Sequence, residues 1–246
     1  MRPGALRTAW RLGLPAAAFA LGALAQGRGW LAALGQQWGD VAYLARGHML
    51  LVLLSGTPAV LLGILLGVVL TRPAMRRFAG PVMQVASIGT TVPTLAILAL
   101  AMTVLGLGTP PAVFGLAALT LLPVLLNTVA GLRQVPQPLR EAARGMGMTG
   151  RQILLQVELP NAALVILAGV RTALAINVGT VPLAFLIGGG GLGELIFTGI
   201  DLMEPSMLLA GALATAALAI AVDLAAGAAQ YWLIPRGVNP FRTSST

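Results

Sequence analysis

The sequence EAARGMGMTGRQILLQVELP, residues Glu141–Pro160, is a polar segment that separates two long apolar blocks. It contains two arginines and two glutamates, whereas the apolar runs on either side, 112–132 and 161–188, share a single arginine. Because ionised side chains are costly in hydrocarbon, the contrast predicts that this segment is exposed on one side of a membrane. The apolar runs on both sides of it are then expected to span the membrane.

The composition supports a membrane location. The chain has 246 residues, of which 57% are hydrophobic and 9% are charged, and its mean hydropathy is +0.90. Soluble domains carry roughly 25% charged residues, so a chain this apolar cannot cover its surface with polar groups. We therefore expect an all-α integral membrane protein with one membrane domain.

Apolar runs predict about six transmembrane helices, and all but the first have about 20 residues or more, enough to cross a hydrocarbon core about 30 Å thick. They are residues 12–25, 48–71, 82–106, 112–132, 161–188 and 206–231. The first run is short and ends in an A-x-A pattern, so a cleaved signal peptide is the alternative to a helix. Residues 27–46 are expected to form an exterior loop with an interfacial helix, and His48 is expected at the interface.

The arginines set the predicted orientation. The net charge is +8, and every basic residue other than the single histidine is an arginine. With both termini in the cytoplasm, only Arg28 and Arg46 fall outside, which is the asymmetry that cytoplasmic loops show. The inner groups are Arg2, Arg7 and Arg11; Arg72, Arg76 and Arg77; Arg133, Arg140, Arg144 and Arg151; and Arg236 and Arg242. This distribution explains the basic charge without nucleic-acid binding.

The polar segment itself predicts a compact helical projection. Residues 139–148 have helical apolar spacing with an arginine-bearing opposite side, and Gly147 and Gly150 are expected to end this helix. Residues 152–158 can form a second short helix before Leu159-Pro160 starts the next span. The alternative is an ordinary amphipathic loop lying on the lipid.

The spacing of Glu141-Ala142-Ala143, Gly147 and Leu159-Pro160 resembles the EAA loop of ABC-importer permeases. Further segments are similar to permeases that import glycine betaine, choline and carnitine: LLPVLLNTVAGL (121–132), AGVRTALAINVGT (168–180) and GGLGELIFTG (190–199). The resemblance implies a type I transmembrane domain with a five-helix core, an additional N-terminal helix and a cytoplasmic coupling helix. It further implies an N-terminal segment 1–45, a permease core 46–234 containing the coupling loop 137–160, and a cytoplasmic tail 235–246.

The resemblance also implies the protein's role and partners. The chain would be the permease subunit of an ATP-driven importer in the bacterial inner membrane. It would work with a second permease copy or a paralogue, two ATPase subunits and an exterior substrate-binding protein. The chain has no Walker A sequence, so ATP and Mg²⁺ would bind to the partner ATPase and no cofactor to this chain.

The residues that would couple the permease to the ATPase are Glu141, Ala142, Ala143, Gly145, Gly147, Leu159 and Pro160. The candidates for the pathway or its gates are Thr90, Thr91, Pro93, Thr94, Asn127, Asn177, Gly190, Gly191 and Gly193. Polar residues in spans can equally serve as hydrogen bonds between helices. The family commonly has a Gln-Thr-Ile-Pro-Ser type sequence where this chain reads Gly89-Thr90-Thr91-Val92-Pro93-Thr94. The glutamine is missing here, which bears on substrate detail.

Three other features have alternative interpretations. Arg171 and Asp223 are ionisable residues within spans, and we expect them to pair, more for structure than for transport. The run Gly188–Gly193 could cradle a phosphate, but no Lys-Ser/Thr follows it, so an outer turn is expected. Cysteine is absent and there is one histidine, so no metal site is expected.

Other functions remain open from the sequence. The chain could be a type I permease for methionine or another amino acid. From other classes, it could be a secondary transporter without an ATPase partner, or a structural membrane subunit without a pathway. No nucleophile with a base and no paired carboxylates are recognisable, so we do not expect an enzyme.

Overall fold

The computed structural model describes residues 27, 35 and 37–235. Its described elements are all helices, in agreement with the predicted all-α class. The expected N-terminal helix, residues 28–34 and 36 of the loop at 27–46, and nearly all of the tail at 235–246 lie outside the described residues.

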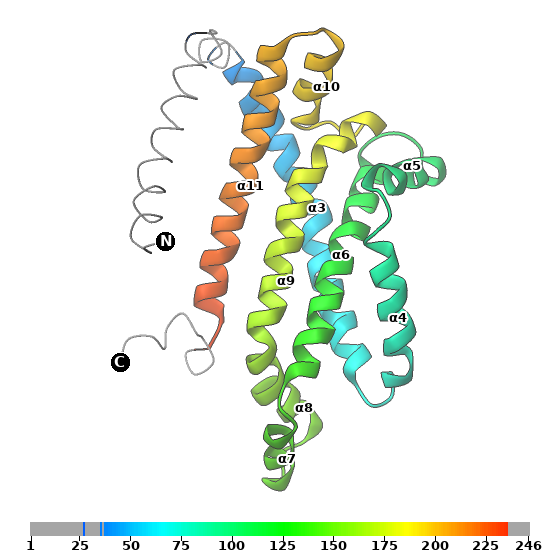
Figure 1. Cartoon of the computed structure of the whole chain (residues 1–246), viewed down its shortest axis with the longest axis vertical. Coiled ribbons are helices and arrows are strands. Elements are labelled where there is room, and N and C mark those ends of the chain that lie inside the picture. The colour runs from blue at the N-terminus through cyan, green and yellow to red at the C-terminus, as the bar shows by residue number, and fades with distance from the viewer. Residues whose placement is uncertain (1–26, 28–34, 36, 236–246) are drawn as a thin grey trace, which may run out of the picture.

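Four long helices form the body of the described chain (Figure 1). They are α3 (Trp38–Thr71), α6 (Thr109–Gln134), α9 (Leu159–Thr180) and α11 (Pro205–Leu233). Within the described ranges, four helical segments are long and apolar enough to cross a membrane, or five if the bent pair α4–α5 counts as one span. The count of five matches the expected five-helix core. Helix α6 packs against both α3 and α9 and is the most buried of the four.

Helix α3 begins earlier than expected. The predicted exterior loop reached residue 46 and the span began at 48, but the helix already starts at Trp38. The helix can start there because charged residues such as Asp40 and Arg46 fit an exposed helical extension as well as they fit a loop. His48, expected at the interface, is fully buried within this helix.

The span expected at 82–106 is not one continuous helix. It is two helices, α4 (Arg76–Gly89) and α5 (Thr94–Leu105), which meet at an angle of 101°. Pro93 lies directly before α5, with φ −56° and ψ 133°. Proline cannot donate a backbone hydrogen bond and disfavours helical geometry in the residue before it, so the helix ends there. Thr90 and Thr91 bond to the carbonyls of Ser87 and Ile88 at the break.

The span expected at 161–188 is also not one continuous α-helix. Helix α9 ends at Thr180 and the chain continues as a 3₁₀ helix, η2 (Val181–Ile187). A glycine turn follows, in which Gly188, Gly190 and Gly191 have φ of 81°, 77° and 83°. Glycine adopts these values without steric cost, so the expected turn is present. The connection expected at 192–205 contains a helix, α10 (Gly193–Asp201).

Three short helices project at the opposite end of the bundle (Figure 1). They are α7 (Gln137–Gly145), α8 (Gly150–Ile153) and the π-helix η1 (Leu154–Glu158), which runs directly into α9. The predicted first helix, 139–148, is therefore present but starts two residues earlier and ends three residues earlier. Gly147 follows it with φ 78°, as expected of a glycine after a helix end, whereas Gly150 begins α8 and does not end α7.

Close packing of α3 on α6 depends on two glycines one helical turn apart. A Cβ atom at Gly63 would lie 2.8 Å from Cγ1 of Val124, and one at Gly67 would lie 2.6 Å from Cβ of Thr128. Small residues four apart allow helix backbones to approach in membranes, where packing replaces the hydrophobic effect between helices. The close approach of α3 to α6 is therefore possible because these two positions of α3 have no side chain.

We expect Gly67→Ala to lower the free energy of unfolding by about 1–3 kcal/mol, because the added methyl group forces α3 away from Thr128. Gly47→Ala is the matched control in the same helix, since nothing lies within 4 Å of a Cβ at that position. It should be neutral or stabilise by up to about 1 kcal/mol through helix propensity. Unfolding of the purified protein in detergent measures both, and equal shifts would contradict the packing argument.

Candidate functional site

The projecting segment α7–η1 presents a mixed surface. Ala143 of the expected coupling set is buried against the protein, while Glu141 and Ala142 are exposed. Leu139 and Met146 are 44% and 75% exposed. Apolar side chains exposed on a projection beyond the spans are available to a partner surface. The structure thus places Glu141, Ala142, Ala143, Gly145 and Gly147 of the expected coupling set in this projection, whereas Leu159 and Pro160 begin α9.

Local hydrogen bonds keep this projection compact. Gln137 donates to the carboxylate of Glu141 one turn later on α7. Thr149 caps α8 by a reciprocal pair: its backbone N–H donates to Oε1 of Gln152 at 2.8 Å, and its Oγ1 accepts from the Gln152 N–H at 3.4 Å. This capping box typically contributes about 1 kcal/mol to a helix start. The turn between α7 and α8 is therefore defined on both sides.

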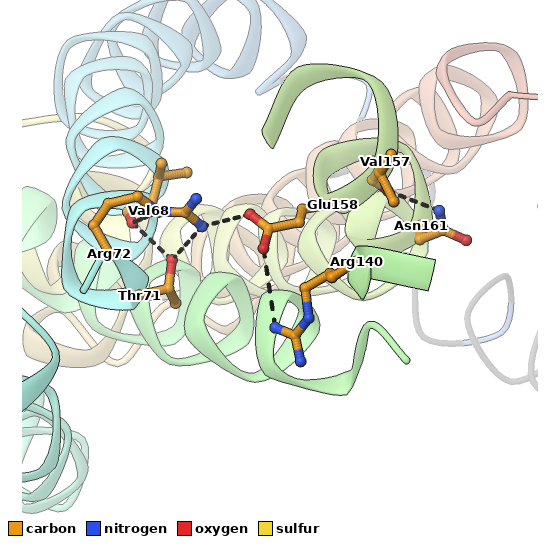
Figure 2. Close-up of polar contacts among 7 residues, drawn as sticks. All are labelled: Val68, Thr71, Arg72, Arg140, Val157, Glu158 and Asn161. Carbon is orange, nitrogen blue, oxygen red and sulfur yellow. Dashed lines mark hydrogen bonds and ion pairs between the residues drawn. The ribbon is translucent and has the colours of Figure 1, made fainter. Parts of the chain in front are cut away.

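One buried glutamate connects the projection to the spans (Figure 2). Glu158 is 7% exposed and lies in the last position of η1. Its Oε2 accepts a hydrogen bond of 2.7 Å from Nη2 of Arg72, directly after α3, and its Oε1 lies 3.9 Å from Nη1 of Arg140 on α7. A single carboxylate therefore joins the end of α3, helix α7 and the start of α9.

Arg72 is itself fixed by the end of α3. Its Nε donates to the carbonyl of Val68 at 3.2 Å, and its Nη2 donates to Oγ1 of Thr71 at 2.9 Å. Arginine can hold several acceptors at once because its donors form a rigid planar fork. The Arg72 guanidinium that binds Glu158 is therefore also held by α3, so Glu158 connects η1 to α3 through a fixed group.

Sequence reasoning missed this triad. From the sequence, Arg72 and Arg140 are recognisable only as cytoplasmic charges, and Glu158 only as part of a short helix. A usable signal was present, because Glu158 stands next to Leu159-Pro160, where the apolar run begins. A carboxylate at the edge of hydrocarbon needs a cationic partner, although the sequence could not say which arginine supplies it.

The pathway candidates lie away from the projection, in four separate places. Thr90, Thr91, Pro93 and Thr94 lie at the α4–α5 corner. Gly190 and Gly191 lie in the turn before α10, and Gly193 begins α10, where a Cβ would lie 2.0 Å from the carbonyl oxygen of Pro182. Asn127 lies on α6 and donates to the carbonyl of Pro123 at 2.8 Å.

Asn177 occupies the centre of a buried polar cluster. It is 1% exposed, and its Nδ2 donates to Oγ of Ser55 on α3 at 3.0 Å and to Oγ1 of Thr120 on α6. Hydrogen bonds of this kind hold transmembrane helices together. The geometry favours the helix-packing alternative for this residue over exposure to a pathway.

His48 satisfies a carbonyl that a proline releases. Pro182 has no N–H to donate to the carbonyl of Val178, four residues earlier. Nε2 of His48 lies 3.1 Å from that oxygen and donates to it. The other ring nitrogen, Nδ1, has no partner among the described residues. The change from α9 to η2 is thus supported from α3, a connection that sequence reasoning missed.

Arg171 on α9 and Asp223 on α11 lie together. Nε and Nη2 of the guanidinium each donate to one carboxylate oxygen, so the contact is bidentate. The two side chains are 40% and 36% exposed. The pair therefore links α9 to α11 at a partly open position within the spans.

The Arg72–Glu158 contact can be tested by a double-mutant cycle. We expect Arg72→Gln and Glu158→Gln each to destabilise the protein, and the double variant to lose less than the sum, with a coupling of about 1–2 kcal/mol. This is below the value for fully buried pairs, because Arg72 is 30% exposed. Unfolding in detergent measures the cycle.

The control cycle replaces Arg72 by Arg77, whose guanidinium lies over the Phe78 ring and makes no ion pair with Glu158 in the described structure. Its coupling should stay within about 0.5 kcal/mol of zero. If the two Arg72 and Glu158 substitutions lower the free energy of unfolding additively, the Arg72–Glu158 contact does not contribute to stability.

Comparisons with known proteins agree with this architecture. The family described as "Binding-protein-dependent transport system inner membrane component" matches residues 59–237. The chain is 53% identical over 184 residues to an osmoprotectant import permease protein of Salmonella typhimurium, covering 75% of this chain and 78% of that protein. It is 40% identical over 207 residues to a choline transport system permease protein of Bacillus subtilis, covering 84% and 94%. It is 42% identical over 206 residues to a carnitine transport permease protein of Listeria monocytogenes, covering 80% and 93%.

The fold is also that of a solved transporter. The MetNI methionine ABC transporter, in an inward-facing conformation, matches with a TM-score of 0.67 at 21% identity, covering 77% of this chain and 94% of the matched chain. At this identity the likeness shows the fold alone. The family match and the relatives together show that the chain belongs to the inner-membrane components of binding-protein-dependent transport systems, as a permease subunit with the type I ABC-transporter fold.

Proposed function

We propose that this permease serves an ATP-driven importer of osmoprotectants of the quaternary-amine class, such as glycine betaine, choline or carnitine. The observation that carries the substrate class is the identity of 53% to an osmoprotectant permease, with choline and carnitine permeases at 40% and 42%. The full assembly would contain a second permease copy or a paralogue, two ATPase subunits and an exterior binding protein. ATP and Mg²⁺ would bind to the ATPase subunits.

The projecting α7–η1 segment supports the proposed coupling role. It lies at the end of the bundle that carries most of the described arginines outside the spans: Arg72, Arg76, Arg77, Arg133, Arg140, Arg144 and Arg151. Arg46 lies toward the opposite end of α3, and the acids Asp40, Glu194, Asp201 and Glu204 lie at that end. This asymmetry favours a cytoplasmic location for the projection in the inner membrane, with both termini on the same side.

The contacts of the projection suggest how motion would be transmitted. When the ATPase subunits close on ATP, they would displace α7, whose Arg140 faces Glu158. The displacement would pass through Glu158 to Arg72 and α3, and along the continuous chain into α9. Movement of these spans would alternate access to the pathway, with substrate delivered by the binding protein.

The turn after α7 provides a test of coupling. Gly147→Ala forces a side chain into φ 78°, at a strain of about 1–2 kcal/mol. We expect transport-coupled ATPase activity to fall about fivefold or more, because α7 is redirected against its partner. Measurement uses the permease assembled with its ATPase subunits in proteoliposomes.

Gly150→Ala is the matched control. A Cβ at Gly147 or at Gly150 meets nothing within 4 Å, and Gly150 begins a helix with ordinary backbone geometry. The control should keep coupled activity. A Gly147→Ala complex that assembles and couples as well as the control would refute the docking role.

Substrate class is tested by uptake with the cognate binding protein present. Radiolabelled glycine betaine, choline or carnitine should accumulate only with ATP, and an excess of unlabelled quaternary amine should abolish the uptake. Excess methionine should leave it unchanged. Uptake that methionine abolishes, with no accumulation of quaternary amines, would instead assign the chain to amino-acid transport.

A further inference from the structure

A basic pocket lies in the corner between the projection and the elbow that joins α3 to α4. Its cavity has a volume of about 450 Å³. The charged side chains that line it are Arg72, Arg76, Arg140, Arg144 and Glu158. Four guanidinium groups against one carboxylate leave a net charge of +3 in the pocket.

The single carboxylate does not neutralise these cations. The two oxygens of Glu158 face Arg72 and Arg140, at 2.7 Å and 3.9 Å. Arg76 and Arg144 have no carboxylate within 4.0 Å among the described residues. They come from different elements, the start of α4 and the end of α7. Both therefore line the cavity with their charge uncompensated.

The chemistry of the lining selects a multivalent oxyanion. Guanidinium groups bind phosphate through paired, charge-assisted hydrogen bonds. A single carboxylate is satisfied by one or two arginines, which is the arrangement Glu158 already has. The remaining arginines suit a tetrahedral group that has more oxygens and more charge. The volume is also within the range of small-ligand sites.

The position of the pocket suggests where the phosphate comes from. The elbow starts where the apolar helix α3 ends, and Glu158 directly precedes α9. The pocket thus lies at the level where the hydrocarbon-facing segments stop, which is where phospholipid headgroups lie. Basic pockets among transmembrane helices on the cytoplasmic side bind anionic headgroups.

We propose that this pocket binds a phosphate group, carried either by an anionic phospholipid or by a soluble phosphate. The site is distinct from the proposed ATPase-docking residues and does not require the osmoprotectant assignment. Arg76 and Arg144 are its recognition residues. Arg72 and Arg140 contribute charge while they hold Glu158.

The test uses two double variants that remove equal charge. Arg76→Gln with Arg144→Gln alters the pocket without touching the Glu158 contacts. Arg77→Gln with Arg151→Gln is the matched control, because neither residue lines the cavity although each is close in sequence to a residue that does. Size-exclusion elution and thermal unfolding check that both variants fold.

The lipid arm measures retained phospholipid by native mass spectrometry. The full chain, with any subunits that co-purify, is extracted from membranes containing phosphatidylglycerol. We expect wild type and control each to retain one phosphatidylglycerol per permease at this site. In the pocket variant, the fraction of permease that carries this lipid should fall about tenfold or more. Washing with 10 mM inorganic phosphate should leave a lipid-occupied site unchanged.

The soluble arm titrates delipidated protein in neutral detergent with inorganic phosphate at constant ionic strength, following thermal unfolding. A soluble phosphate is assigned if phosphate raises the Tm of wild type and control saturably and the lipid arm finds no retained lipid. In the pocket variant, the apparent affinity for phosphate should then be about tenfold weaker, or the rise in Tm absent. Pocket variant and control that behave alike in both arms would overturn the proposal, and the arginines would then serve a partner protein or solvent. If the double variant does not fold, Arg76→Gln and Arg144→Gln alone are compared with Arg77→Gln and Arg151→Gln.

Discussion

The absence of water from the hydrocarbon core constrains the whole structure, because each helix break there must leave no backbone group unpaired. The end of α9 shows how this is met. Pro182 cannot bond the carbonyl of Val178, and the side chain of His48 on α3 donates to it instead. A change of helix type in one span is therefore paired with a polar side chain in another. Asn177, one residue earlier, is likewise bonded to Ser55 and Thr120.

The same constraint explains which features the sequence could predict. Long apolar runs predicted α6 and α11 closely, since length and hydropathy determine a simple span. The runs around Pro93 and Pro182 look equally apolar, but one bends by 101° and the other changes to a 3₁₀ helix. Such outcomes depend on which neighbour satisfies the freed groups. At Pro182 that neighbour is His48, which lies 130 residues from Val178 in sequence, so local patterns could not resolve it.

The candidate site divides in the same way. Its helices could be predicted because Glu141 to Pro160 contains its own turn glycine and an amphipathic spacing. The connection through Glu158 could not, because Arg72 lies 86 residues away in sequence and nothing local distinguishes it from Arg76 or Arg77. For the same reason the basic pocket emerges only from the fold, which places the beginning of α4 beside the end of α7.

The helices differ in how directly they are connected to the projection, and this difference bears on the proposed transport mechanism. The projection is linked to α3 by Glu158, follows α6 after a two-residue connection and runs directly into α9, so the proposed displacement of α7 would reach all three helices. Helix α11 is joined to α9 by the partly exposed Arg171–Asp223 pair, and only 17% of its most apolar segment is buried. Helix α5 lies beyond a sharp corner. In the proposed coupling, α3, α6 and α9 would therefore be the helices on which the projection acts directly, and the α4–α5 corner and α11 would follow through their packing against these helices.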